Sequence, residues 1–116
     1  MGGNSVTLLL VCLGGALGSG ARYLVALATP RGTLVVNLVG SFCIGLVLAV
    51  MRPSDLRLML VTGVLGGFTT YSAFNEETLA LFRADAFGAA VANVLVTLAG
   101  CLVAGAAGHA LARLVR

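Results

Sequence analysis

The chain has 116 residues, of which 59% are apolar and 9% are charged, whereas an average soluble domain is about 25% charged. This composition excludes a protein that folds in water. Seven arginines and four acidic residues give a formal net charge of +3, but the arginines are spread singly along the sequence. Because they form no patch, we expect no nucleic acid partner.

Charged residues and turn formers divide the chain into four apolar segments, each close to the roughly 20 residues that cross a bilayer. We therefore predict an all-α membrane protein, a single transmembrane domain over residues 1–116. Its four helices are expected at about residues 6–28, 33–51, 57–82 and 86–111. Pro30-Arg31-Gly32, Pro53-Ser54-Asp55 and Arg83-Ala84-Asp85 are typical of the turns between them.

Small residues recur at a spacing of four, which lets helix backbones approach closely in lipid. We interpret these residues as contact faces of a bundle: Gly14 and Gly18, Gly63 and Gly67, and Gly100, Ala104 and Gly108.

Arginines near the segment ends give only a weak orientation signal. Arg52, Arg57, Arg113 and Arg116 fall on one side, and Arg22, Arg31 and Arg83 fall on the other. Four against three suggests a chain that inserts both ways, with two copies pairing antiparallel about a two-fold axis in the membrane plane. Arg22, near the end of the first segment, either snorkels to the headgroups or partners a glutamate of the third segment.

The second segment carries a polar stripe, because Thr33, Asn37 and Ser41 recur every fourth residue on one helical face. Asn37 either makes an interhelical hydrogen bond or lines a pathway. The fourth segment carries a shorter stripe of Asn93 and Thr97, although Thr97 could instead bond back to its own helix.

The stretch from Gly63 to Phe74 predicts an interruption of the third helix. Gly66 and Gly67, followed by two threonines, weaken a helix in mid-span, and the alternative is a simple kink. A broken helix exposes backbone polar groups, which are tolerated in a membrane only where protein buries them or a cavity or ion satisfies them. Glu76 and Glu77 follow, and we expect one to be solvated and the other partnered.

Three pieces of the chain together carry a family resemblance: GGALGSGARY from Gly14, GTLVVNLVGSFCIG from Gly32 and GVLGGFTTYSAF from Gly63. They resemble the bacterial Fluc/CrcB fluoride channel family. This resemblance implies an antiparallel homodimer with two fluoride pores and a structural sodium ion at its centre. The sodium ligands of the family match the backbone carbonyls of Gly66 and Thr69.

The pore residues of the family also match positions in this chain. The pore asparagine matches Asn37, and the two aromatic residues of the third helix match Tyr71 and Phe74, with tyrosine standing where phenylalanine is commonest. Ala73 replaces a small hydroxyl residue. The resemblance also implies roles beside the ion path for Thr33, Ser72, Glu77 and Thr97.

A fluoride path needs hydrogen-bond donors that replace the water around a small, strongly hydrated anion. The hydroxyl and amide groups of the matched residues can donate, the edge of an aromatic ring is positive, and Arg22 at a mouth would attract anions. Selectivity for fluoride over chloride is implied by the resemblance alone. We therefore expect a multi-pass protein of the cell inner membrane that exports fluoride passively and gives fluoride resistance.

The main alternative is a small four-helix dual-topology multidrug exporter. Proton-coupled export of that kind needs a carboxylate in the first membrane helix, and the first acidic residue here is Asp55, in a turn. An enzyme is not expected, because no nucleophile with a histidine and a carboxylate and no metal-ligand cluster stands out in the sequence. A purely structural membrane subunit is the other alternative.

Overall fold

The computed structural model describes residues 2–116 and contains helices but no strand in that range. Three helices are unbroken: α1 (Gly2–Ala28), α2 (Gly32–Val50) and α6 (Phe87–Leu114). Each is long and apolar enough to cross a membrane. The protein is therefore an all-helical membrane protein, as its composition predicts.

The remaining membrane segment is built from four pieces. These are α3 (Asp55–Leu58), the π-helix η1 (Met59–Leu65), α4 (Gly66–Phe68) and α5 (Tyr71–Arg83). The pieces up to α4 follow one another without a gap, whereas the chain is extended at Thr69 and Thr70, with ψ values of 158° and 116°. The predicted interruption of this segment is therefore present.

The predicted position of that interruption, at Gly66 and Gly67, is wrong. Both glycines are helical, and the chain leaves the helix only after Phe68. Gly67 is needed for packing, since a Cβ on it would lie 2.6 Å from the carbonyl oxygen of Gly15 in α1. The break falls instead at Thr69 and Thr70, which are β-branched and therefore also have low helix propensity.

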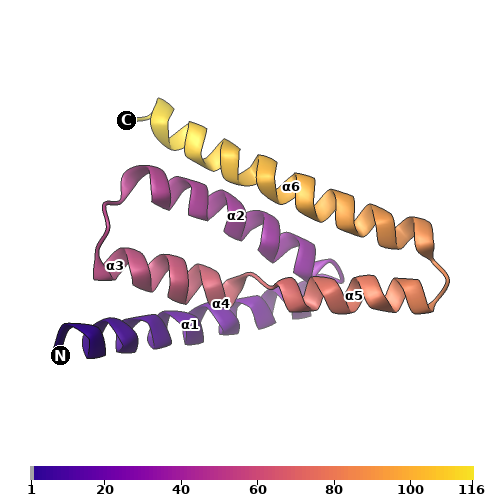
Figure 1. Cartoon of the computed structure of the whole chain (residues 1–116), viewed down its shortest axis with the longest axis horizontal. Helices are drawn as coiled ribbons and strands as arrows, with labels where there is room; N and C mark the ends of the chain where they lie inside the picture. The colour runs from indigo at the N-terminus through magenta and orange to yellow at the C-terminus, as the bar shows by residue number, and fades with distance from the viewer. Residues whose placement is uncertain (1) are drawn as a thin grey trace.

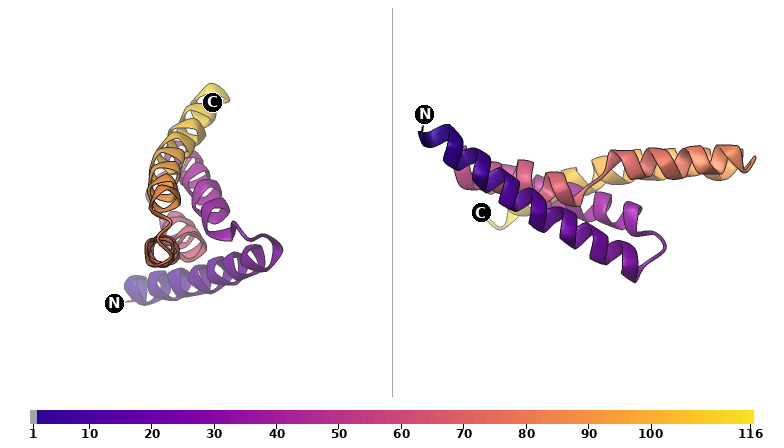
Figure 2. Two further views of the ribbon diagram at one scale, coloured as in Figure 1. Left: turned by 90° about the vertical axis from the view of Figure 1, so that its right-hand side faces the viewer. Right: turned by 90° about the horizontal axis from the view of Figure 1, so that it is seen from below.

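The helices pair in two layers around this segment. Figure 1 shows α2 lying along α6, α1 lying along η1 and α4, and α5 lying along the first half of α6. In Figure 2, α1 diverges from the α5–α6 pair at the end away from the N-terminus. As a result most residues of α5 are exposed, whereas Thr70 just before it is buried.

A glycine seam holds together the helices of each of the two main pairs. In the seam between α1 and η1–α4, a Cβ on Gly14 would lie 2.6 Å from the carbonyl oxygen of Met59. In the seam between α2 and α6, a Cβ on Gly45 would meet the carbonyl oxygen of Gly105. These contacts confirm the predicted faces at Gly14, Gly18, Gly63, Gly67 and Gly108, whereas Gly100 meets only the Leu38 side chain.

Most large apolar side chains point outward. Leu17, Leu24 and Leu102 are 64%, 66% and 76% exposed, whereas the buried apolar residues of the described chain are Val36, Phe74, Ala90 and Ala112. This arrangement is stable when lipid replaces water as the solvent of the outer surface. The few buried polar residues, which are Asn37, Thr70, Thr78 and Thr97, therefore indicate where a functional site lies.

Candidate functional site

The break in the third membrane segment is fixed by hydrogen bonds of its own two threonines. The amide and the hydroxyl of Thr69 both donate to the carbonyl oxygen of Leu65, each at 2.9 Å, and close the end of α4. The Thr70 hydroxyl accepts a hydrogen bond from the Ala73 amide at 3.1 Å and caps the start of α5. Both helix ends therefore have a defined stop.

Asn37 of α2 holds the extended backbone between those ends. Its Nδ2 donates to the Thr70 carbonyl oxygen at 3.0 Å, and its Oδ1 accepts from the Thr70 amide at 2.7 Å. Asn37 and Thr70 are 8% and 7% exposed, so this amide pair replaces the partners that an unbroken helix would give the backbone. The interhelical hydrogen bond considered for Asn37 is thus present, and one Nδ2 hydrogen is left over for another acceptor.

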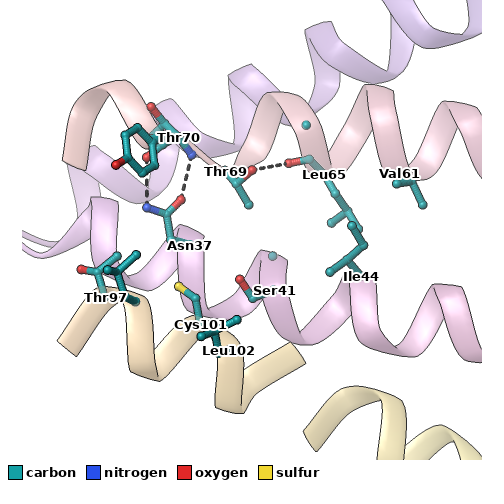
Figure 3. Close-up of a pocket in the computed structure, with 14 residues that line it drawn as sticks. Asn37, Ser41, Ile44, Val61, Leu65, Thr69, Thr70, Thr97, Cys101 and Leu102 are labelled. Carbon is teal, nitrogen blue, oxygen red and sulfur yellow. Dashed lines mark hydrogen bonds between the residues drawn. The ribbon is translucent and has the colours of Figure 1, made fainter. Parts of the chain in front are cut away.

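The carbonyl groups just before the break have lost their helical partners. The amides of Thr70 and Ala73, four residues after Gly66 and Thr69, donate to Asn37 Oδ1 and to the Thr70 hydroxyl. Neither the Gly66 nor the Thr69 carbonyl therefore accepts its usual helical hydrogen bond. Both residues line a cavity of about 380 Å³, whose walls come from α2, η1, α4, the break, α5 and α6. Figure 3 shows this cavity, with Asn37 and Ser41 from α2, Thr97 and Cys101 from α6, and Thr69 and Thr70 from the break.

The cavity lining combines donors with apolar surface. Asn37, Ser41, Tyr71 and Thr97 line it, and the hydroxyl of Thr97 makes no hydrogen bond to another described residue. The alternative in which Thr97 bonds back to its own helix is therefore not what the structure has. Free hydroxyl and amide hydrogens in a largely apolar cavity form a site for a small acceptor, above all an anion.

Two aromatic rings stand one turn apart at the start of α5. The Tyr71 and Phe74 rings meet edge to face, with centroids 5.3 Å apart and planes at 64°. Tyr71 is 72% exposed and lines the cavity, whereas Phe74 is 5% exposed and lies behind it. The Tyr71 ring is thus available to a group in the cavity, and the edges of aromatic rings carry partial positive charge.

A second group of polar side chains continues from the break along α5. The Thr33 hydroxyl donates to Glu77 Oε1 at 2.5 Å, and the Ser72 hydroxyl lies 3.1 Å from the Thr70 hydroxyl. Deeper between α5 and α6, Asn93 Nδ2 donates to the Thr78 hydroxyl at 2.9 Å. Polar groups therefore follow α5 for about two turns from the break.

Arg22 of α1 lines a separate cavity of about 280 Å³ with Thr33, Thr70 and Ala73. It makes no ion pair with Glu76 or Glu77 within the described chain, so the proposed arginine–glutamate partnership is wrong. Glu77 turns to Thr33 on α2 instead, because α1 diverges from α5 at this end. Thr70 lines both cavities, which places them on the two sides of the break.

The structure thus gathers most of the residues singled out in the sequence around one point. Asn37, Gly66, Thr69, Tyr71 and Thr97 share the larger cavity, Arg22 and Thr33 share the smaller one, and Ser72, Phe74 and Glu77 adjoin them without lining either. Sequence reasoning missed Thr70, which joins the two cavities. The signal was available, since a threonine three residues before a helical amide is a common N-cap.

Comparisons with known proteins place this arrangement in a family. Residues 9–109 match the family model described as CrcB-like protein, Camphor Resistance (CrcB). The chain is 54% identical to a fluoride-specific ion channel FluC from Anaeromyxobacter sp. (strain K), over 91% of this chain and 94% of that protein. It is 42% identical to the protein of the same name from Agrobacterium fabrum, over 93% and 97% of the two chains.

Proposed function

This chain belongs to the CrcB family, and we propose that it is a fluoride-specific ion channel whose path follows the break in the third membrane segment. The observation that carries the proposal is the cavity at Thr69 and Thr70. Free donors and an aromatic ring line it, inside a bundle whose exposed side chains are largely apolar. In a membrane such groups mark the route of an ion.

The donors are arranged for a stepwise exchange of the water around a fluoride ion. On the side of the larger cavity the ion would meet the spare Nδ2 hydrogen of Asn37, the Thr97 hydroxyl and the ring edge of Tyr71. Along α5 it would pass Ser72, Phe74, and the hydroxyl of Thr33 beside Glu77. Several weak sites allow an ion to leave as readily as it enters.

Arg22 supplies positive charge where the path opens on the α1 side. It lines the smaller cavity with Thr33 and Thr70, and among the described residues no carboxylate neutralises it. A fixed cation at a mouth raises the local concentration of anions before they enter the narrow part of the path.

We further propose that carbonyl groups at the break hold a structural sodium ion. Gly66 and Thr69 line one cavity and their carbonyls lack the usual helical partners, and carbonyl oxygens suit hard cations. Two carbonyls are fewer ligands than a hard cation takes, so a second chain would have to supply the rest. When bound, sodium would add a fixed positive charge near the anion path.

An antiparallel homodimer, which we propose as the assembly, would supply the remaining ligands. The cavity is open, and Tyr71 on its rim is 72% exposed although it lies at the level of the membrane segments. A second copy turned about a two-fold axis in the membrane plane would cover this surface and double the carbonyls. The assembly would then have two fluoride paths and one central sodium site.

The cellular role that we propose is passive export of fluoride across the cell inner membrane, which relieves fluoride toxicity. A channel supplies no energy, so the ion moves down its electrochemical gradient, and the membrane potential drives an anion outward when the interior is negative.

The direct test is a flux measurement on the purified protein in liposomes, with a fluoride electrode as the detector and chloride as the control anion. We expect rapid fluoride release and no chloride release. Absence of fluoride release from vesicles that contain folded protein would overturn the proposal. Export of a cationic dye without fluoride flux would instead support the multidrug exporter. The absence of a carboxylate from α1 counts against that alternative.

The sodium site has its own test. Replacement of sodium by N-methylglucamine throughout purification and assay should lower both thermal stability and fluoride flux, and sodium should restore them. Equal stability and equal flux without sodium would exclude a structural sodium ion while leaving the channel itself in place.

A further inference from the structure

Charge is distributed unevenly between the two ends of the molecule. Figure 1 shows the N-terminus, the start of α3, the end of α2 and the C-terminus at one end, which we call the basic end. Its charged residues are Arg52, Arg57, Arg113, Arg116 and Asp55, a formal charge of +3. The other half holds three arginines and three carboxylates, Arg22, Arg31, Arg83, Glu76, Glu77 and Asp85, and has no net charge.

The arginines of the basic end are not neutralised within the described chain. Arg57 Nη1 donates to the Met51 carbonyl at 3.0 Å, and Arg116 Nη1 donates to the Ala49 carbonyl at 3.0 Å. Both bonds cap the end of α2, but a carbonyl partner leaves the positive charge in place. Asp55, the only acidic side chain that we assign to this end, accepts a hydrogen bond from the Thr7 hydroxyl at 2.8 Å.

The surroundings of these arginines are those of a membrane boundary. Leu56, Leu114 and Val115 stand beside them in the chain and are 56%, 83% and 80% exposed. Between α2 and α3–η1 there is a cavity of about 270 Å³, with Arg57 and Ser54 in its lining and an apolar wall of Leu48, Leu58 and Val61. A cation next to an apolar wall matches a lipid, which carries its phosphate next to its acyl chains.

We propose that the basic end binds acidic phospholipid, with Arg52, Arg57 and Arg113 contacting the phosphate and the Leu48–Leu58–Val61 wall contacting an acyl chain. A second copy packed antiparallel would bring its other half beside this end. Because that half has no net charge, it would leave the net positive charge of this end unchanged. The positive charge is thus left for headgroups, and each arginine near an anionic surface contributes about 1 kcal/mol. This inference stands independently of the proposed ion path.

The test is native mass spectrometry of the detergent-solubilised full chain, titrated with phosphatidylglycerol or with phosphatidylcholine that has the same acyl chains. R52Q/R113Q is the test variant, because neither side chain makes a hydrogen bond to another described residue. R31Q/R83Q is the matched control, since it removes the same charge from the other half. We expect R52Q/R113Q to bind phosphatidylglycerol about thirtyfold more weakly, the equivalent of about 2 kcal/mol, and R31Q/R83Q to bind it normally.

If phosphatidylglycerol binds equally weakly to both variants, the affinity depends on net charge alone, and the proposed site is overturned. An unchanged affinity in R52Q/R113Q, or equal binding of the two lipids by the unmodified protein, would overturn it as well. Displacement of phosphatidylglycerol by millimolar glycerol 3-phosphate would assign the site to a free phosphate ester instead of a lipid. Should R52Q/R113Q unfold, R52K/R113K replaces it, with folding checked by thermal unfolding. This variant keeps both charges, so it must keep the preference for phosphatidylglycerol over phosphatidylcholine, and loss of that preference would overturn the site.

Discussion

Along the seam between α1 and η1–α4 backbone lies against backbone, whereas at Thr69 and Thr70 the backbone is extended and is held by the side chain of Asn37. In the seam, the main chain is hydrogen-bonded mainly inside its own helix, so glycine can bring two helices together without any hydrogen bond between them. At the break, those internal bonds are missing.

This difference shows where specificity is located in the protein. The seams tolerate any sequence that keeps small residues in register, because they depend on volume alone. The break requires particular atoms at particular places, namely one amide from α2 and one hydroxyl from Thr70. Substitutions in the two regions should therefore fail in different ways, by lost assembly in one and by lost conduction in the other.

The largest effect is expected in the seam. A Cβ on Gly18 would overlap the carbonyl oxygen of Val64, whereas a Cβ on Gly20, in the same helix, meets nothing within 4 Å. Gly18→Ala should destabilise the protein by about 3 kcal/mol, because backbone must move apart. Gly20→Ala should be neutral or stabilising by about 1 kcal/mol through helix propensity. Thermal unfolding in detergent measures both, and equal midpoints would contradict the seam.

Next is the clamp on the break. Asn37→Ala leaves the buried amide and carbonyl of Thr70 without partners and should cost about 2 kcal/mol. It should also reduce fluoride flux at least tenfold. Asn93→Ala, which removes one half-buried hydrogen bond to Thr78, is the control and should cost about 1 kcal/mol. The clamp is refuted if the Asn37 variant matches the Asn93 variant in both stability and flux.

The aromatic pair should affect conduction more than stability. Phe74→Ile keeps an apolar side chain but removes the ring that meets Tyr71, and we expect fluoride efflux from liposomes to fall about tenfold, or about 1.4 kcal/mol. Phe82→Ile is the control in the same helix, since Phe82 pairs with Phe87 at 5.8 Å, far from the break. Identical efflux rates for the two variants would remove Phe74 from the path.

The smallest effect is expected at the cap of α5. Thr70→Ala removes the oxygen that accepts from the Ala73 amide and should cost about 1 kcal/mol, whereas Thr70→Ser keeps that oxygen and should restore most of the stability. Thermal unfolding is again the measurement. A serine variant no more stable than the alanine variant would show that the methyl group, and not the cap, is what matters at Thr70.

Sequence patterns predicted the helical segments and the residues that surround the break, but not their partners. The stripe of Thr33, Asn37 and Ser41 was correctly placed on one face of α2, because a helical period depends only on spacing. The position of the break at Thr69 rather than at Gly66 was not predictable from propensity, since glycine weakens a helix as much as threonine does. Contact with α1 decided it.

The sequence by itself determined two things: that this protein is surrounded by lipid, and which family it belongs to. Apolar content, span length and motif are properties of neighbouring residues, and no folding is needed to evaluate them. Only the tertiary structure decided that Asn37 clamps Thr70, that Glu77 meets Thr33 and not Arg22, and that Arg57 and Arg116 of the basic end bond to backbone carbonyls, which leave their charge in place. These outcomes depend on how four segments rotate and diverge, and a hydrogen bond, unlike hydropathy, exists only when two distant residues reach the same place.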